Sequence, residues 1–174
     1  MQRYLISAVI CMIGYVFTYI SCPLWAFIAA VFKLTKLPGI FSLIHTFDDD
    51  IYGSKYRKSG MPATFVERFK TACWWIWRNP NYGFNAKVLG LPVEGTLVEV
   101  KGSFEFFDTG KTCVITTKFT NPIFEEDFFG YRRDQHLMGR RFIKMWFGWQ
   151  HNSFDNKHYM LKLMFNPFRI ANNG

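Results

Sequence analysis

The N-terminal part of the chain contains one long stretch without a charged side chain. Residues 4–32 read Y-L-I-S-A-V-I-C-M-I-G-Y-V-F-T-Y-I-S-C-P-L-W-A-F-I-A-A-V-F. This stretch exceeds the roughly 20 apolar residues that a helix needs to span a bilayer, and it is too short for two full spans with a turn between them. A helix in the core of a soluble protein is rarely so long and so uniformly apolar. A membrane-spanning helix is therefore the favoured interpretation.

A cleaved signal peptide is the main alternative for this stretch. Its apolar region would be only about 7–15 residues long, with a small-residue cleavage site after it. Here Ser21-Cys22 is followed by Pro23 and by more apolar residues. We predict a spanning helix from residue 4 to about 22, within an anchor that covers residues 1–34. Pro23 is expected to kink or end this helix, because it lacks a backbone donor and clashes with the preceding turn. Residues 24–34 then either continue the span or leave along the interface.

The charges that flank the apolar stretch indicate an orientation. Arg3 alone precedes the stretch, whereas five basic residues follow it closely: Lys33, Lys36, Lys55, Arg57 and Lys58. Because Lys and Arg are enriched in cytoplasmic segments, the long C-terminal part is expected in the cytoplasm. After the stretch the only cysteines are Cys73 and Cys113, which form no C-x-x-C pair, so no disulfide framework is predicted.

The net charge of the chain is +8 at pH 7. Such an excess is typical of binding to nucleic acid or to anionic lipid headgroups, and it also occurs on ordinary solvated surfaces. Beside a membrane anchor, lipid is the simpler partner, and nucleic acid is disfavoured. The charge alone does not define a specific site.

A connector and an amphipathic helix are expected next. Residues 35–63 read as an irregular connector rich in Gly and Pro. Thr64 and Glu67 have the spacing of a capping box, which predicts that a helix begins there. One face of this helix is apolar, and the opposite face carries Arg68 and other charged residues. Trp74 and Trp75 fall toward the polar side. They suit a helix at the level of lipid headgroups, or they pack under a C-terminal sheet.

The stretch W-R-N-P-N-Y-G-F, residues 77–84, is interpreted as a structural joint. A proline pushes the preceding residue out of helical geometry, so the helix is expected to end at Arg78-Asn79-Pro80. Gly83 is expected to let the chain reverse into a strand near residues 86–89. Tyr82 and Phe84 would then lie on the covered face of the sheet.

Alternation with period two dominates the remaining sequence. Residues 96–107 and 113–120 flank the turn Asp108-Thr109-Gly110-Lys111, which is typical of a β-hairpin. Residues 141–149 and 158–165 predict a second hairpin. The sequence therefore predicts an α+β protein: an N-terminal transmembrane helix, one amphipathic helix, and an antiparallel sheet built from hairpins, with residues 64–174 as its α+β domain.

Several of these elements resemble a family of uncharacterised, membrane-anchored proteins from tailed bacteriophages and prophages. The resemblance rests on L-P-G-I-F-S-L-I-H-T-F-D-D-D-I-Y-G (37–53), the tryptophan-rich helix that ends in R-N-P-N-Y-G-F (78–84), V-L-G (88–90), G-W-Q (148–150) and F-N-P-F (165–168). It spans most of the chain, with R-N-P-x-Y-G-F as its most specific part. It implies a phage-encoded protein in the inner membrane of the host, and it implies no known activity.

Some stretches imitate active sites without completing them. Asp108-Thr109-Gly110 matches the D-T-G of aspartic proteases, but such an enzyme needs two carboxylates that share a proton. The same segment with Lys111 lacks the earlier glycine of a P-loop, since Glu105 stands there. Asp48-Asp49-Asp50 lacks calcium-loop spacing. The histidines His136, His151 and His158 lack the close spacing of a zinc site. No cofactor or metal is therefore expected.

Two classes of function remain open from the sequence. The favoured one is a non-enzymatic accessory protein that binds the bilayer surface or a host or phage protein. Its candidate contact residues are Trp74, Trp75, Arg78, Arg132, Arg133, Arg140 and Arg141. The rival is an enzyme whose site is assembled from Asp48, Asp134, His136 and Arg140. A basic nucleic-acid-binding protein, using Tyr131-Arg132-Arg133 and Arg140-Arg141-Phe142, is a further alternative.

Overall fold

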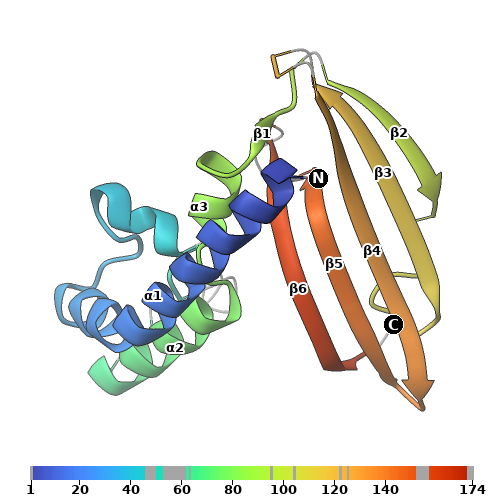
Figure 1. Ribbon diagram of the computed structural model, residues 1–174. Helices are drawn as coiled ribbons and strands as arrows, with labels where there is room; N and C mark the ends of the chain where they lie inside the picture. Colours follow the sequence, from blue (N-terminus) through green and yellow to red (C-terminus); the bar gives the residue numbers. More distant parts are fainter. Residues whose placement is uncertain are drawn as a thin grey trace. The chain divides into compact units, whose positions relative to one another are not determined.

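The structure is a computed structural model that describes residues 2–45, 50–52, 62, 64–94, 96–103, 105–121, 123–124, 126–151 and 157–171. It divides into two compact units (Figure 1). The helical unit comprises Leu5–Leu89, and the sheet unit comprises Met1–Tyr4 with Gly90–Gly174. The predicted α+β class, with a long apolar N-terminal helix, a second helix and an antiparallel sheet, is confirmed. The sequence-based division grouped residues 64–89 with the sheet, whereas the structure places them in the helical unit.

Helix α1 (Gln2–Phe32) is 31 residues long and runs through Pro23 without a break. At 1.5 Å per residue it is about 46 Å long, longer than the roughly 30 Å hydrocarbon core of a bilayer. Of the two expectations for Pro23, a kink or an end of the helix, the second is wrong. Residues on both sides of the proline pack on α2. Cys22 Sγ lies 3.6 Å from the carbonyl oxygen of Cys73, and the rings of Phe27 and Phe65 are 5.8 Å apart.

Helix α2 (Phe65–Arg78) begins and ends where the sequence predicts. The side chain of Thr64 accepts a hydrogen bond from the Glu67 amide, and the Glu67 carboxylate accepts one from the Thr64 amide, which confirms the capping box. Asn79 caps its C-terminus just before Pro80. The placement of Arg68 on the polar face is wrong, because Arg68 is buried and donates to the carbonyls of Ala30 and Pro62.

The segment after α2 forms a short helix where a strand was predicted. The 3₁₀ helix η1 (Gly39–Ile44) and helix α3 (Tyr82–Lys87) pack together in the helical unit. Asn81 starts α3 in a left-handed conformation, with φ 52°, so Asn81 rather than Gly83 makes the reversal. Asparagine tolerates this region better than most residues do. Because α3 is helical, Tyr82 and Phe84 do not lie, as predicted, on an extended strand with both side chains on one face.

The sheet unit contains a six-stranded antiparallel sheet in the order β1-β6-β5-β4-β3-β2. Its strands are β1 (Leu91–Pro92), β2 (Leu97–Gly102), β3 (Cys113–Asn121), β4 (Glu126–Met138), β5 (Arg141–His151) and β6 (His158–Ile170). The hairpins β2–β3 and β5–β6 confirm the two predicted hairpins. Strand β4, which pairs with both β3 and β5, was not predicted from the sequence.

One face of the sheet carries the core of this unit. Phe119, Phe128 and Phe142 project from it and are almost fully buried, together with Trp149 and Leu161. The Asn121 amide donates to the Pro92 carbonyl, so the end of β3 meets β1 although three strands separate them in the sheet. The sheet is therefore curled at this end (Figure 1).

Candidate functional site

The outer surface of α1 is lined by large apolar side chains. Ile13 is 65% exposed and Ile20 is 77% exposed. The same holds, at 41% or more, for Leu5, Ile6, Val9, Ile10, Met12, Val16, Phe17, Leu24, Phe27, Val31 and Phe32. The helix is long and apolar enough to cross a membrane. Its exposed side offers no polar stripe to water along these positions.

The opposite side of α1 carries small and polar residues where it meets the rest of the helical unit. Thr18, Ala26 and Ala29 are completely buried, as is Ala30, and Cys22 is nearly so. In a water-soluble helix the large apolar residues would face inward and the polar ones outward. Helices that pack inside a bilayer instead bring small residues together, because lipid tails are as apolar as leucine.

Polar side chains of the R-N-P-N-Y-G-F-N segment fasten α3 to α1. The Thr18 hydroxyl donates to the Asn81 carboxamide oxygen, and the Asn85 amide donates to the Tyr15 hydroxyl at 3.1 Å. Asn81 and Asn85 are both buried. A Cβ on Gly14 would lie 2.1 Å from the Asn81 amide nitrogen, so only glycine leaves room for this contact. The segment is thus a joint between helices.

The same joint is fixed to η1 through its backbone. The amides of Asn81 and Gly83 donate to the carbonyls of Ile44 and His45. A Cβ on Gly83 would lie 3.0 Å from the Leu43 Cα, so Gly83 is needed for close approach, not for an unusual φ. The sequence shows that a glycine stands here but not which of its two uses applies.

Three of the predicted contact residues form an aromatic and basic cluster on α2. The rings of Trp74 and Trp75 are 5.4 Å apart and stacked. The Arg78 guanidinium carbon lies 5.0 Å from the Trp74 ring and 5.4 Å from the Trp75 ring. Trp74 is 55% exposed, so this cluster lies on the surface of the helical unit. Arginine and tryptophan together are typical of side chains at the lipid headgroup level.

The concave side of the sheet holds a buried cluster of charges. Arg132 donates to both carboxylate oxygens of Asp134 and to Asp108, while Lys144 donates to Asp108 at 2.9 Å. Arg132 was predicted to be a surface contact. It is buried instead, since two carboxylates compensate its charge. The Phe107 ring, centred 4.0 Å from the Arg132 guanidinium carbon, also covers it.

The pKa values within this cluster move in the same direction on both partners of the Asp108–Lys144 pair. Burial opposes ionisation of Asp108, but the hydrogen bonds from Lys144 and Arg132 outweigh it and lower the pKa of the carboxyl group. Burial and the nearby Arg132 also lower the pKa of Lys144, although Asp108 opposes this. The pKa of the Asp108 carboxyl group falls because two cations donate to it, whereas the pKa of Lys144 falls mainly because its ammonium group is buried.

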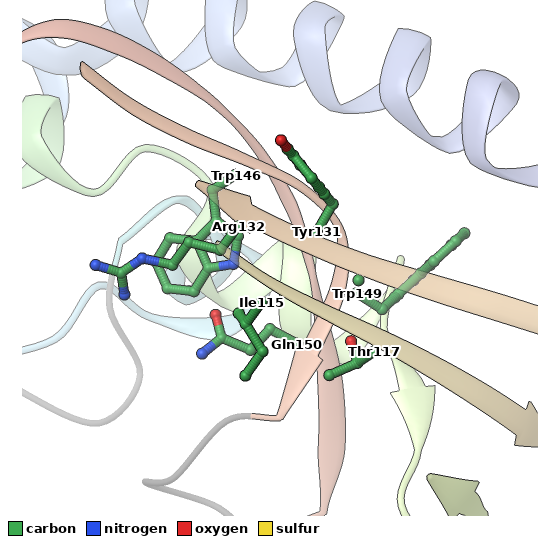
Figure 2. A pocket seen from close by; sticks show the side chains of 8 residues that line it. Ile115, Thr117, Tyr131, Arg132, Trp146, Trp149 and Gln150 are labelled. Atoms are coloured by element: carbon green, nitrogen blue, oxygen red, sulfur yellow. The ribbon is translucent and has the colours of Figure 1, made fainter. Parts of the chain in front are cut away.

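A small pocket adjoins the charge cluster (Figure 2). Figure 2 shows Arg132 beside the ring of Trp146, and Tyr131 directed away from both. The cavity volume is ≈ 20 Å³. Since a single water molecule needs about this much space, the pocket is too small for a substrate.

The described residues of the alternative catalytic set, Asp134, His136 and Arg140, each contact a group outside that set. Asp134 is fully buried and bound to Arg132, and His136 Nδ1 contacts the carbonyl oxygen of Gly110 at 2.8 Å. Arg140 donates to the Ala171 carbonyl, and Asp48 lies outside the described residues. The D-T-G segment is a turn, as its residues predict, with φ 62° at Asp108 and 83° at Gly110. Among the described residues no group of His, Cys, Asp and Glu could hold a metal ion.

These features define an α+β protein with a long, outwardly apolar helix and a separate antiparallel sheet. Comparison with protein families gives the particular relationship. The chain belongs to the family described as "Family of unknown function (DUF7338)", whose model matches residues 1–173. No curated protein and no solved structure matches the chain.

Proposed function

We propose that the protein is a membrane-anchored accessory protein that acts by binding rather than by catalysis. The observation that carries this proposal is the arrangement of α1, which exposes its large apolar side chains and buries its small and polar ones. A soluble monomer rarely exposes a contiguous apolar patch beyond a few hundred Å². Along α1 this patch extends from Leu5 to Phe32.

The polar contacts inside the helical unit support the same proposal. Asn81 and Asn85 reach α1 from a short helix, and hydrogen bonds of this kind hold helices together inside a bilayer. The Trp74–Trp75–Arg78 cluster suits the headgroup level of such a membrane.

The proposal also covers which membrane holds the protein and on which side of it the sheet unit lies. The basic residues after α1 favour the sheet unit in the cytoplasm. The resemblance to phage proteins supports a phage-encoded protein in the host inner membrane, where a host or phage protein is the expected partner of the sheet unit. The buried charge cluster supports binding over catalysis, because its carboxylates are engaged by Arg132 and Lys144 and the adjoining pocket is minute.

The full chain, expressed in a bacterium and separated into soluble and membrane fractions, tests the anchor. We expect it to stay in the membrane pellet after washing with alkaline carbonate, and release of the intact chain would overturn an integral anchor. Reporter fusions after Gly174 test the orientation. A periplasmic reporter that is active there, with an inactive cytoplasmic reporter, would overturn the cytoplasmic placement.

A further inference from the structure

The outward side of the sheet, opposite the charge cluster, carries two cross-strand rows of apolar and basic residues. Residues directly opposite each other on neighbouring strands share a face. The first row is Val114, Arg133, Met145 and Phe165, and the second is Met138, Arg141 and Ile170. The partners of the neighbouring positions, Arg132 with Trp146 and Asp134 with Lys144, point to the concave side.

A bulge in β6 brings a further aromatic ring to the same outward side. Phe142 pairs with Arg169 and Lys144 pairs with Asn166, so β6 has one residue more than β5 over this interval. Arg169 lies on the concave side, 3.9 Å from Asp108, and Phe168 therefore points outward. Phe168 is 82% exposed, Met138 78%, Phe165 63% and Ile170 57%. We call these four residues with Arg133 and Arg141 the outward patch.

The composition of the outward patch limits what binds it. It contains two arginines and no carboxylate, with Arg140 in the adjoining turn. A second copy of the chain, packed symmetrically, would place the arginines of both copies in one interface without a carboxylate to compensate them, which is unfavourable. Anionic headgroups complement the arginines, while the layer beneath them accepts methionine, isoleucine and phenylalanine side chains.

We infer that the outward patch is a second membrane-contact surface, which binds a bilayer rich in anionic lipid. This inference rests on the proposed function, because an anchor in the same chain keeps the sheet unit near a membrane and raises the effective concentration of lipid. The patch lies near the end of β4, far along the strand from Glu126, to which Arg3 is bound at the start of α1. The patch and the Arg3–Glu126 ion pair therefore lie toward opposite ends of β4.

Photo-crosslinking with the full chain tests the inference. Phe168 is replaced by benzoylphenylalanine, and the protein is placed in nanodiscs of phosphatidylcholine with or without phosphatidylglycerol. We expect a lipid adduct from position 168 that is several-fold stronger with phosphatidylglycerol and weakens in high salt. The double variant Arg133→Glu, Arg141→Glu should reduce it by a similar factor. Position 98 is the matched control, because Val98 pairs with the buried Phe119 on the concave side and should give no adduct.

The outcomes separate this inference from the anchor. Carbonate extraction of the same preparations reports on α1 alone. If the chain resists extraction but position 168 crosslinks to no lipid, or crosslinks to protein instead, the outward patch is not a lipid surface while the anchor stands. If carbonate releases the chain but position 168 still labels phosphatidylglycerol vesicles, the anchor fails and the patch stands. Equal labelling in the two lipid mixtures would overturn the anionic preference.

Discussion

Helix α1 of the helical unit and the sheet unit bury different kinds of side chain. In the helical unit the completely buried side chains of α1 are small or polar, such as Thr18 and Ala26, while Ile20 is 77% exposed. In the sheet unit the completely or nearly completely buried side chains include the large rings of Trp149, Phe119 and Phe142. A water-soluble domain has the second arrangement, because burying apolar area is what stabilises it.

Under the proposed membrane anchor, α1 and the sheet unit face different solvents. In water, an isoleucine such as Ile20 gains by being buried, whereas in lipid it gains nothing and only close packing and hydrogen bonds favour contact. Amide and hydroxyl groups pair in the helical unit at Thr18 and Asn81, and full charges pair in the sheet unit at Arg132 and Asp134.

The largest expected effect comes from the core of the sheet unit. Trp149→Ala removes a ring that is 2% exposed and that packs on Tyr4 and Phe128. We expect a loss of about 3–5 kcal/mol in the free energy of unfolding, because the cavity cannot collapse fully. Thermal unfolding followed by near-ultraviolet circular dichroism measures it. Trp77→Ala, at a ring 60% exposed in the helical unit, is the control. Equal losses in both variants would contradict a water-type core in the sheet.

A pair of equally exposed residues tests the contrast in solvent directly. Ile20 is 77% exposed on α1 and Leu97 is 74% exposed on β2. If α1 faces lipid, Ile20→Asp should cost about 2.5–3.5 kcal/mol of membrane insertion, whereas Leu97→Asp at a water-facing edge should change stability by no more than about 0.5 kcal/mol. The fraction of chain that resists carbonate extraction measures the first effect, and thermal unfolding measures the second. Comparable, small effects at both positions would show that both units face water.

The joint of the helical unit gives a smaller effect. Gly83→Val adds a branched side chain where even a Cβ would lie 3.0 Å from the Leu43 Cα and 3.2 Å from two carbonyl oxygens. Such overpacking costs typically 1–3 kcal/mol. We expect faster proteolysis between η1 and α3 and a lower folded yield, while the near-ultraviolet signal of the sheet is retained. Gly39→Val is a control for added bulk, because a Cβ there meets nothing within 4 Å, although its φ of 58° adds some strain. A normal yield with only a lost partner would make the segment a binding site instead.

The sequence predicts those parts of the fold that are determined by residues close together in the chain. The charge-free stretch predicts α1, the Thr64–Glu67 pair predicts the start of α2, and alternation around a turn predicts both hairpins. Each signal depends on neighbours within a few residues. Strand β4 was not predicted, because Arg132 and Asp134 interrupt the apolar alternation of its sequence. Asp108, which also compensates Arg132, is 24 residues away in the chain.

The candidate site was harder to predict for the same reason. The sequence marks Trp74, Trp75 and Arg78 as candidate contacts on one helix, and the structure brings them together because i+3 and i+4 positions of a helix are neighbours. It cannot tell that Arg132 points inward while Arg133 points outward, because this depends on register with β3 and β5. Arg68 was misplaced since only the tertiary contact with Ala30 and Pro62 makes its burial favourable.

The smallest predicted effect is a pH dependence confined to the sheet unit. Because the pKa of Asp108 is lowered on folding, the folded state binds fewer protons than the unfolded state as the pH falls below about 4. The stabilising contribution of this carboxylate is therefore complete above its unfolded pKa and is lost as the pH falls through the lower, folded pKa. Asp108→Asn keeps a residue that tolerates φ 62° and removes the charge, so it should cost about 1 kcal/mol at pH 7 and flatten the acid limb of the stability profile.

Thermal midpoints of the near-ultraviolet signal between pH 3 and pH 7 measure this effect. Asp127→Asn is the control, because the Asp127–Lys118 ion pair lies on the surface, where such pairs contribute little. We therefore expect acid to lower the stability of the sheet unit through its charge cluster. The amide and hydroxyl contacts of Thr18, Asn81 and Asn85 in the helical unit do not titrate in this range and should be unchanged. An acid limb that is identical in the wild-type chain and in Asp108→Asn would show that the cluster does not stabilise the sheet through this carboxylate.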